Sequence, residues 1–232
     1  LLIMVKSHLD LFIGILQLFQ KKWQKMAREL LSNIGYIKSK LDKESMNKLK
    51  TYIKNKKGSH KSSLAGNISK SYNLKDTDNW FFENVLLKLV DEYREDLNGI
   101  VPSVLTNNCR YVLNSFWVNF QKKYEFNPIH SHSQAVFSFV VWVEIPSSYK
   151  KEKEIPFMKE SNNPSSNSFQ FIYTNILGSV STETFCLEPE DVGTILFFPA
   201  SLSHQVYPFY LSNKYRISVS GNIALDPKQI IQ

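Results

Sequence analysis

The sequence predicts an α+β protein in which a helical front part precedes an antiparallel β jelly roll. Three observations favour this fold class. Apolar residues recur at helical spacing before residue 100, whereas short segments rich in β-branched and aromatic residues follow Val101, separated by Pro, Gly, Asn and Ser. The chain has 232 residues, 43% of them hydrophobic, with only 8 Gly and 9 Pro, so it can bury a core. This composition excludes a disordered or collagen-like protein.

Three amphipathic helices are predicted in the front part. The first ends near Leu31, because apolar residues that include Phe12, Leu16 and Phe19 recur on one face. The other two are predicted over 42–56 and 78–97. We expect these helices to pack on one sheet of the jelly roll, which would cover their apolar faces.

Six strands are predicted in the second half of the chain. They are expected over 111–120, 135–145, 169–173, 194–198, 205–209 and 215–223. The polar segment 149–168 contains a run of Lys and Glu followed by Asn, Pro and Ser, so we expect it to be a long surface insertion.

Positive charge is concentrated near the start of the chain. The net charge is +7, yet residues 1–75 hold 16 Lys and Arg against 4 Asp and Glu. The basic run from Lys48 to Lys61 is able to contact the phosphates of a nucleic acid. It is more typical of a solvated helix face that runs into a loop. We favour this second interpretation because a basic run specifies no geometry.

The sequence favours a soluble, cytoplasmic protein. Two cysteines, Cys109 and Cys186, are too few for a secreted disulfide scaffold. The longest uncharged run near the start, residues 11–20, is shorter than the roughly 20 residues that a membrane-spanning helix needs. Lys21 and Lys22 follow it where a signal peptide would have small residues. We expect neither a membrane span nor export.

Three of the five histidines fall in the β half of the chain, at positions 130, 132 and 204. If the chain is extended from Ile129 onward, His130 and His132 project from the same face, roughly 6.6–6.8 Å apart along the strand, and converge on one metal ion. His204 follows an apolar strand that ends at Pro199.

A line of polar residues runs along the last predicted strand. Alternation places Arg216, Ser218, Ser220 and Asn222 on one face and apolar residues on the other. A buried guanidinium is costly without an anionic partner. Glu125 and Glu144 are candidate partners, and a bound anionic ligand is another. Similar alternation puts Asn119 beside Trp117 on one strand face.

Together these motifs resemble the iron(II)/2-oxoglutarate-dependent oxygenases. The likeness rests on His130-x-His132, on Phe197-Phe198-Pro199 followed by His204, and on Arg216-x-Ser218. It is greatest to a small branch common in bacteriophage, and it covers residues 35–232. We therefore expect residues 1–34 to be an N-terminal helical extension and residues 35–232 to be the oxygenase domain, with a helical front part over 35–100 and a β core over 101–232.

The resemblance implies a double-stranded β-helix with a catalytic set of four residues. His130 and His204 match the family's two metal-binding histidines, and His132 is the expected third ligand of Fe(II), where most of the superfamily has Asp or Glu. Arg216 matches the residue that pairs with 2-oxoglutarate. Ser218 and Asn119 are expected to contact the same co-substrate. O₂ is the second co-substrate that the resemblance implies.

The leading hypothesis is therefore an oxidoreductase that hydroxylates an unidentified acceptor while it converts 2-oxoglutarate to succinate. Residues 149–168 and 58–76 are candidates for a lid or substrate rim. One alternative is a three-histidine, cupin-type metal dioxygenase that acts without 2-oxoglutarate, in which Arg216 binds the substrate's own carboxylate. Another is a non-enzymatic jelly-roll interaction module.

Overall fold

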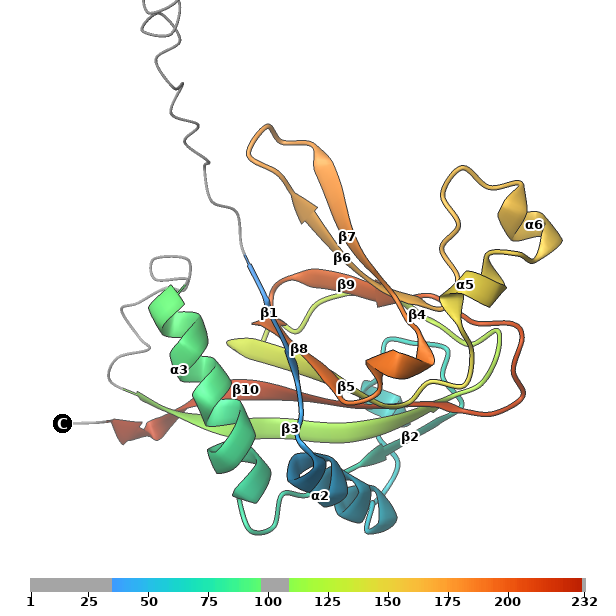
Figure 1. Ribbon diagram of the computed structural model, residues 1–232. Helices are drawn as coiled ribbons and strands as arrows, with labels where there is room; N and C mark the ends of the chain where they lie inside the picture. Colours follow the sequence, from blue (N-terminus) through green and yellow to red (C-terminus); the bar gives the residue numbers. More distant parts are fainter. Residues whose placement is uncertain (1–34, 97–108, 231–232) are drawn as a thin grey trace, which may run out of the picture. The chain divides into compact units, whose positions relative to one another are not determined.

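Two antiparallel sheets form the body of the computed structural model, which describes residues 35–96 and 109–230 (Figure 1). The larger sheet has the strand order β1-β8-β5-β10-β3-β2, and the smaller has the order β4-β9-β6-β7. This arrangement confirms the predicted jelly roll. The strands of the larger sheet are β1 (Ile37–Lys40), β2 (Lys70–Asn73), β3 (Cys109–Gln121), β5 (Phe137–Glu144), β8 (Thr194–Pro199) and β10 (Arg216–Ile230). Those of the smaller sheet are β4 (Asn127–His130), β6 (Ser168–Thr174), β7 (Val180–Cys186) and β9 (Ser203–Val206).

Two helices cover one face of the larger sheet, as predicted (Figure 1). Helix α2 (Lys43–Lys54) begins after Asp42, whose Oδ1 accepts a hydrogen bond from the backbone N–H of Ser45 at 2.7 Å. Helix α3 (Leu87–Asp96) continues a π-helical turn over Phe82–Leu86. The apolar faces of both helices pack against strands β5 and β10, in a core that contains Leu49, Phe81, Leu86, Val90, Phe137, Phe139, Val141 and Val219.

The opposite face of the larger sheet meets the smaller sheet. Residues of β5 alternate between the two cores, since Phe139 and Val141 pack with the helices while Val140 and Trp142 pack with Phe169 of β6. The second core therefore lies between the sheets. Its further buried members are Ile145, Phe171, Leu187, Leu196, Phe198 and Leu202.

The predicted strand at 205–209 and the extended segment expected from Ile129 onward have different limits in the structure. Strand β9 covers Ser203–Val206 and not 205–209, because the backbone at Tyr207 turns to donate to Ser168 O and to accept from Arg216. Strand β4 ends at His130, so the extended segment expected to carry His132 is wrong. Strands β1, β2, β4 and β7 were not predicted, and β1 and β2 lie within the predicted helical front part.

The segment expected to be a surface insertion is partly buried. It contains two short helices, α5 (Tyr149–Glu152) and α6 (Pro156–Lys159), and both Glu152 and Asn167 have no exposed surface. The prediction of a purely superficial loop is therefore wrong for these residues. The predicted N-terminal helix in 1–34 lies outside the described residues. Within the described part of the chain, no helix has the length and apolar character needed to cross a membrane.

Candidate active site

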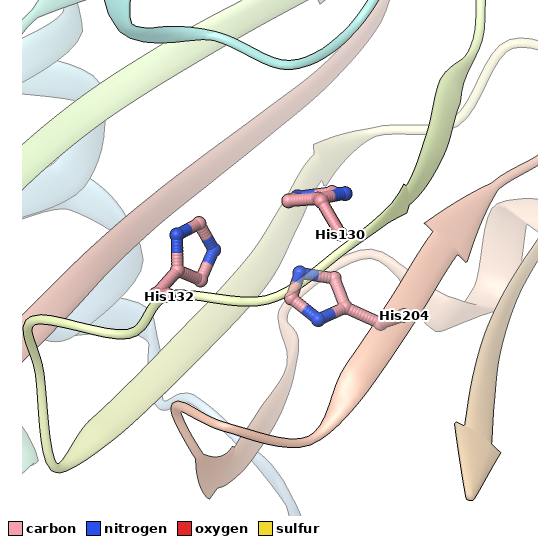
Figure 2. Close-up of side chains that lie close together, drawn as sticks. All are labelled: His130, His132 and His204. Atoms are coloured by element: carbon pink, nitrogen blue, oxygen red, sulfur yellow. The ribbon is translucent and has the colours of Figure 1, made fainter.

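Three histidines come together between the two sheets (Figure 2). His130 is the last residue of β4 and pairs in register with His204 of β9. His132 lies two residues beyond the end of β4, where its backbone N–H donates to Ala200 O at 2.8 Å. One ring nitrogen from each histidine lies within 4.8 Å of those of the other two. The predicted residues thus converge, although a backbone hydrogen bond and not continued strand geometry positions His132.

Backbone carbonyls orient two of these rings. His130 Nδ1 lies 2.8 Å from Pro128 O, and His204 Nδ1 lies 2.9 Å from Leu202 O. A carbonyl oxygen only accepts, so Nδ1–H donates in both rings and Nε2 keeps its lone pair. This is the usual outer-shell arrangement of histidines that bind a metal ion through Nε2.

The three imidazoles are neutral at neutral pH. Burial lowers the pKa of His130, and the Pro128 carbonyl opposes this only partly. Burial, with smaller contributions from His130 and His60, lowers the pKa of His132 to about 4. Burial, followed by the effect of His130, lowers the pKa of His204 to about 3. Three neutral nitrogen donors in one cluster suit a transition metal such as iron, zinc, copper or nickel.

A cavity of about 430 Å³ adjoins the histidines. Arg216, Ser218, Ser220 and Asn222 of β10 all line it, so the predicted polar face is confirmed. Strand β3 pairs with β10 and lines the same cavity with Gln121, Asn119, Trp117 and Ser115.

Arg216 lies in the wall of this cavity and is only 2% exposed. Its Nε and Nη2 donate to Gln121 Oε1 at 3.2 and 2.8 Å, Nη1 donates to Asn167 Oδ1 at 2.9 Å, and Nη2 donates to Tyr207 O at 2.7 Å. All three partners are neutral, so neither Glu125 nor Glu144 is the partner. Burial lowers the pKa of Arg216 to about 9, although the Glu152 carboxylate opposes this.

These contacts leave the guanidinium with positive charge and few free donors. Arg216 has five N–H groups, and the four hydrogen bonds to Gln121, Asn167 and Tyr207 leave one N–H on Nη1. Among the described residues no anion forms a hydrogen bond with the guanidinium, and the Glu152 carboxylate acts on its charge without a direct contact. The cavity gives an anionic ligand access to the same side chain. This arrangement suits a carboxylate ligand.

Sequence reasoning missed the residues that hold Arg216. Asn167 adopts φ of +41°, a left-handed conformation that Asn tolerates, and its Nδ2 donates to Ser147 O and Leu187 O, both at 2.8 Å. Glu152 accepts from the backbone N–H groups of Tyr210 and Leu211. It thereby anchors the loop that contains the Tyr207 carbonyl. A polar segment without periodicity gave no signal for either role.

The two other predicted co-substrate contacts lie together in the cavity wall. Ser218 and Asn119 are register partners on β10 and β3. Asn119 is 4% exposed, and its Oδ1 accepts from Ser71 Oγ at 2.7 Å, which leaves the amide Nδ2 as a donor. Of the two candidate rim segments, 58–76 lines the cavity through His60, Leu64 and neighbouring residues, whereas none of the described residues of 149–168 does so.

Residues 115–222 match the family model described as "Putative 2OG-Fe(II) oxygenase". Over this region the chain is similar to a 2OG-Fe(II) oxygenase domain. The matched region runs from β3 to β10 and contains the three histidines, Arg216 and Ser218. The match indicates an oxidoreductase of the 2OG-Fe(II) oxygenase kind, a family that uses Fe(II) and 2-oxoglutarate. The resemblance to the bacteriophage branch stays a prediction.

Solved structures similar to this chain include two prolyl hydroxylases and a protein crystallised with hygromycin B. The viral collagen prolyl hydroxylase of Paramecium Bursaria Chlorella virus-1 is 13% identical, with 81% of this chain and 94% of that chain covered and a TM-score of 0.47. The Pseudomonas putida prolyl-4-hydroxylase is 11% identical, with 83% and 93% covered and a TM-score of 0.45. HygX of Streptomyces hygroscopicus, with nickel, 2-oxoglutarate and hygromycin B bound, is 10% identical, with 82% and 83% covered and a TM-score of 0.49.

No curated protein matches this chain. The likeness to a 2OG-Fe(II) oxygenase rests on the match of residues 115–222. Nucleic-acid contact through the basic run of residues 48–61 has no support from these relatives or from the described structure, and it stays a prediction.

Proposed function

We propose that this protein is an oxygenase that hydroxylates an acceptor substrate while it converts 2-oxoglutarate and O₂ to succinate and CO₂. One observation carries the proposal. A single cavity contains both a cluster of three neutral histidines and a buried arginine whose partners are all neutral, so it offers a metal site and an anion site side by side. Fe(II) and 2-oxoglutarate, the pair used by this family, need these two sites.

His130, His132 and His204 would hold Fe(II). The fit rests on the donor set: ring nitrogens lie within 4.8 Å of one another, and two rings are fixed by Nδ1–H donation so that Nε2 remains available. Bound Fe(II) would supply the activation of O₂ that the oxidation needs. Because no carboxylate accompanies the three imidazoles among the described residues, a bound metal would keep its full positive charge toward an anionic co-substrate.

Arg216 would bind the carboxylate of 2-oxoglutarate that lies farther from the histidines. The remaining Nη1 N–H of Arg216 provides one charge-assisted hydrogen bond, and Ser218 and the Asn119 amide provide donors on the same wall. The positive charge of Arg216, which has only neutral protein partners, would then gain its counterion.

In the overall reaction, one O₂ oxidises two molecules. 2-Oxoglutarate loses its first carboxyl as CO₂ and gains one oxygen atom as the new carboxylate of succinate. The acceptor C–H bond breaks, and a C–OH bond forms with the second oxygen atom. Aromatic residues exclude water on one side of the site, since Phe169 stacks on His204 at 5.5 Å and Phe198 packs edge-on to it at 5.0 Å between ring centroids.

A second candidate function follows from the same histidines. Three imidazoles without a carboxylate also suit a metal dioxygenase of the cupin type, in which Arg216 would bind the carboxylate of the substrate itself. The two functions differ in whether 2-oxoglutarate is consumed. A non-enzymatic jelly-roll module would need neither metal nor co-substrate.

Succinate formation tests the proposal. Protein loaded with Fe(II) is incubated with 2-oxoglutarate and O₂, with and without a panel of acceptors, and succinate is measured by mass spectrometry. We expect succinate that requires Fe(II) and O₂ and that disappears in His204→Ala. Retention of Fe(II) without binding or conversion of 2-oxoglutarate would favour the cupin-type dioxygenase. Failure to retain Fe(II) would favour the interaction module.

A further inference from the structure

The opening of the cavity is polar but carries no charge. Its exposed lining residues bear hydroxyl, amide or methyl groups: Ser63, Ala65, Asn114, Ser131, Ser133 and Gln134. The whole chain has 28 Lys and Arg and 21 Asp and Glu, so the uncharged opening does not reflect a low overall content of charged residues. The opening therefore offers hydrogen bonds and no counterion.

Deeper in the cavity, Arg216 is the one charged group among the described lining residues. Under the proposed function, the two carboxylates of 2-oxoglutarate offset two of the three positive charges of Fe(II) and Arg216, and the buried Glu152 carboxylate offsets the third. A second charged group that entered would leave water without meeting an opposite charge, which costs free energy. An amide or hydroxyl group would instead exchange its hydrogen bonds to water for hydrogen bonds to the wall.

A β-bulge adds one more polar side chain to the opening. Asn222 pairs with Ser115 and Ile223 pairs with Leu113, so Asn114 is the extra residue of β3. Two successive residues, Asn114 and Ser115, consequently line the cavity, whereas regular alternation would present only one of them.

The wall beside His132 contains a donor without a partner. Trp117 is 5% exposed, lies edge-on to His132 with ring centroids 5.9 Å apart, and has a buried indole Nε1 that makes no hydrogen bond. His60 stacks on the indole at 4.7 Å and donates from Nδ1 to Asn73 Oδ1 at 2.7 Å, which leaves Nε2 as an acceptor. A donor and an acceptor together complement an amide or a hydroxyl.

We propose that the acceptor substrate presents an uncharged, hydrogen-bonding group to the histidines, an amide or a hydroxyl, and that Trp117 and His60 determine this specificity. The inference rests on the proposed function, because it assigns Arg216 to 2-oxoglutarate. It extends that function by excluding acceptors whose reacting end is an anion or a cation.

Three small probes test the inference on protein that contains Zn(II) and saturating 2-oxoglutarate. N-methylacetamide is uncharged, methanesulfonate is an anion, and tetramethylammonium is a cation. NMR titration follows the indole N–H signal of Trp117, assigned by its loss in Trp117→Phe. We expect N-methylacetamide to shift this signal and to bind at least about tenfold more tightly than either ion.

Charge variants of the exposed opening supply the control. Asn114→Asp should improve tetramethylammonium binding relative to the amide, whereas Asn162→Asp, at an exposed position outside the cavity, should leave the ranking unchanged. An ion that binds wild-type protein as tightly as the amide, or an amide that leaves the Trp117 signal in place, would overturn the inference. Binding of 2-oxoglutarate is measured in the same samples. If it fails, the proposed function is wrong, while the ranking of the probes still reports the preference of the cavity.

Discussion

Substitution of Arg216 by lysine should separate co-substrate binding from metal binding. Arg216 makes four hydrogen bonds to Gln121, Asn167 and Tyr207 from a rigid planar group. A lysine has three N–H donors on a single nitrogen, so it cannot keep these bonds and also contact a carboxylate. The histidines lie on other segments of the chain, so their geometry should persist.

The expected loss follows from the contact removed. One charge-assisted hydrogen bond contributes about 1.5–3 kcal/mol, so the dissociation constant of 2-oxoglutarate should rise about ten- to a hundredfold. Isothermal titration of 2-oxoglutarate into anaerobic, Fe(II)-loaded protein measures this constant, and elemental analysis measures the retained iron.

Two further variants make this result interpretable. Arg110→Lys changes an exposed arginine of β3 that does not line the cavity, and it should bind 2-oxoglutarate normally. Ser218→Ala removes one proposed contact without altering a buried charge, and it should weaken binding by a smaller factor. Unchanged affinity in Arg216→Lys, or loss of iron together with 2-oxoglutarate, would refute the assignment of Arg216.

Three other predictions address the metal site and its surroundings. His132→Ala should weaken Fe(II) binding substantially whereas His132→Asp should retain it, and equal iron content in both variants would contradict a ligand role. Glu152→Gln should lower the free energy of unfolding by about 1–3 kcal/mol and weaken 2-oxoglutarate binding, because it disturbs buried N–H partners; Glu154→Gln, on the exposed side, should do neither. The metal-free protein should lose stability as the pH falls from about 6.5 toward 4, since burial keeps the pKa of His132 near 4 and that of His204 near 3 while the unfolded chain takes up protons near 6.5. Constant stability over this range in denaturant titrations would contradict buried neutral histidines.

The faces of the central strands could be predicted because side chains alternate with a period of two. This rule placed Arg216 and Ser218 on one face of the last strand and its apolar residues on the other. In the structure the first face lines the cavity, and Val219 of the second face packs in the core with the helices. The three histidines could be selected because their residue type suits a metal and their motif resembles a known family.

Features that depend on tertiary contacts could not be predicted. His132 is positioned by the carbonyl of Ala200, which lies far along the chain, and no local pattern encodes that hydrogen bond. Asn167 and Glu152 lie in a polar segment that reads as solvent-exposed, yet the need to satisfy buried backbone groups and Arg216 draws them inside. His60 immediately precedes a short 3₁₀ helix, Lys61–Ser63, and its sequence context gave no sign that it stacks on Trp117.

One cavity should bind both a metal ion, through three histidines, and 2-oxoglutarate beside it. Anaerobic titration of 2-oxoglutarate into Fe(II)-loaded and into metal-free protein tests this most directly. We predict one molecule of 2-oxoglutarate for each iron, with much weaker binding when the metal is absent or when His204 is replaced by alanine. Equal binding with and without iron, or no binding to the iron-loaded protein, would contradict the claim.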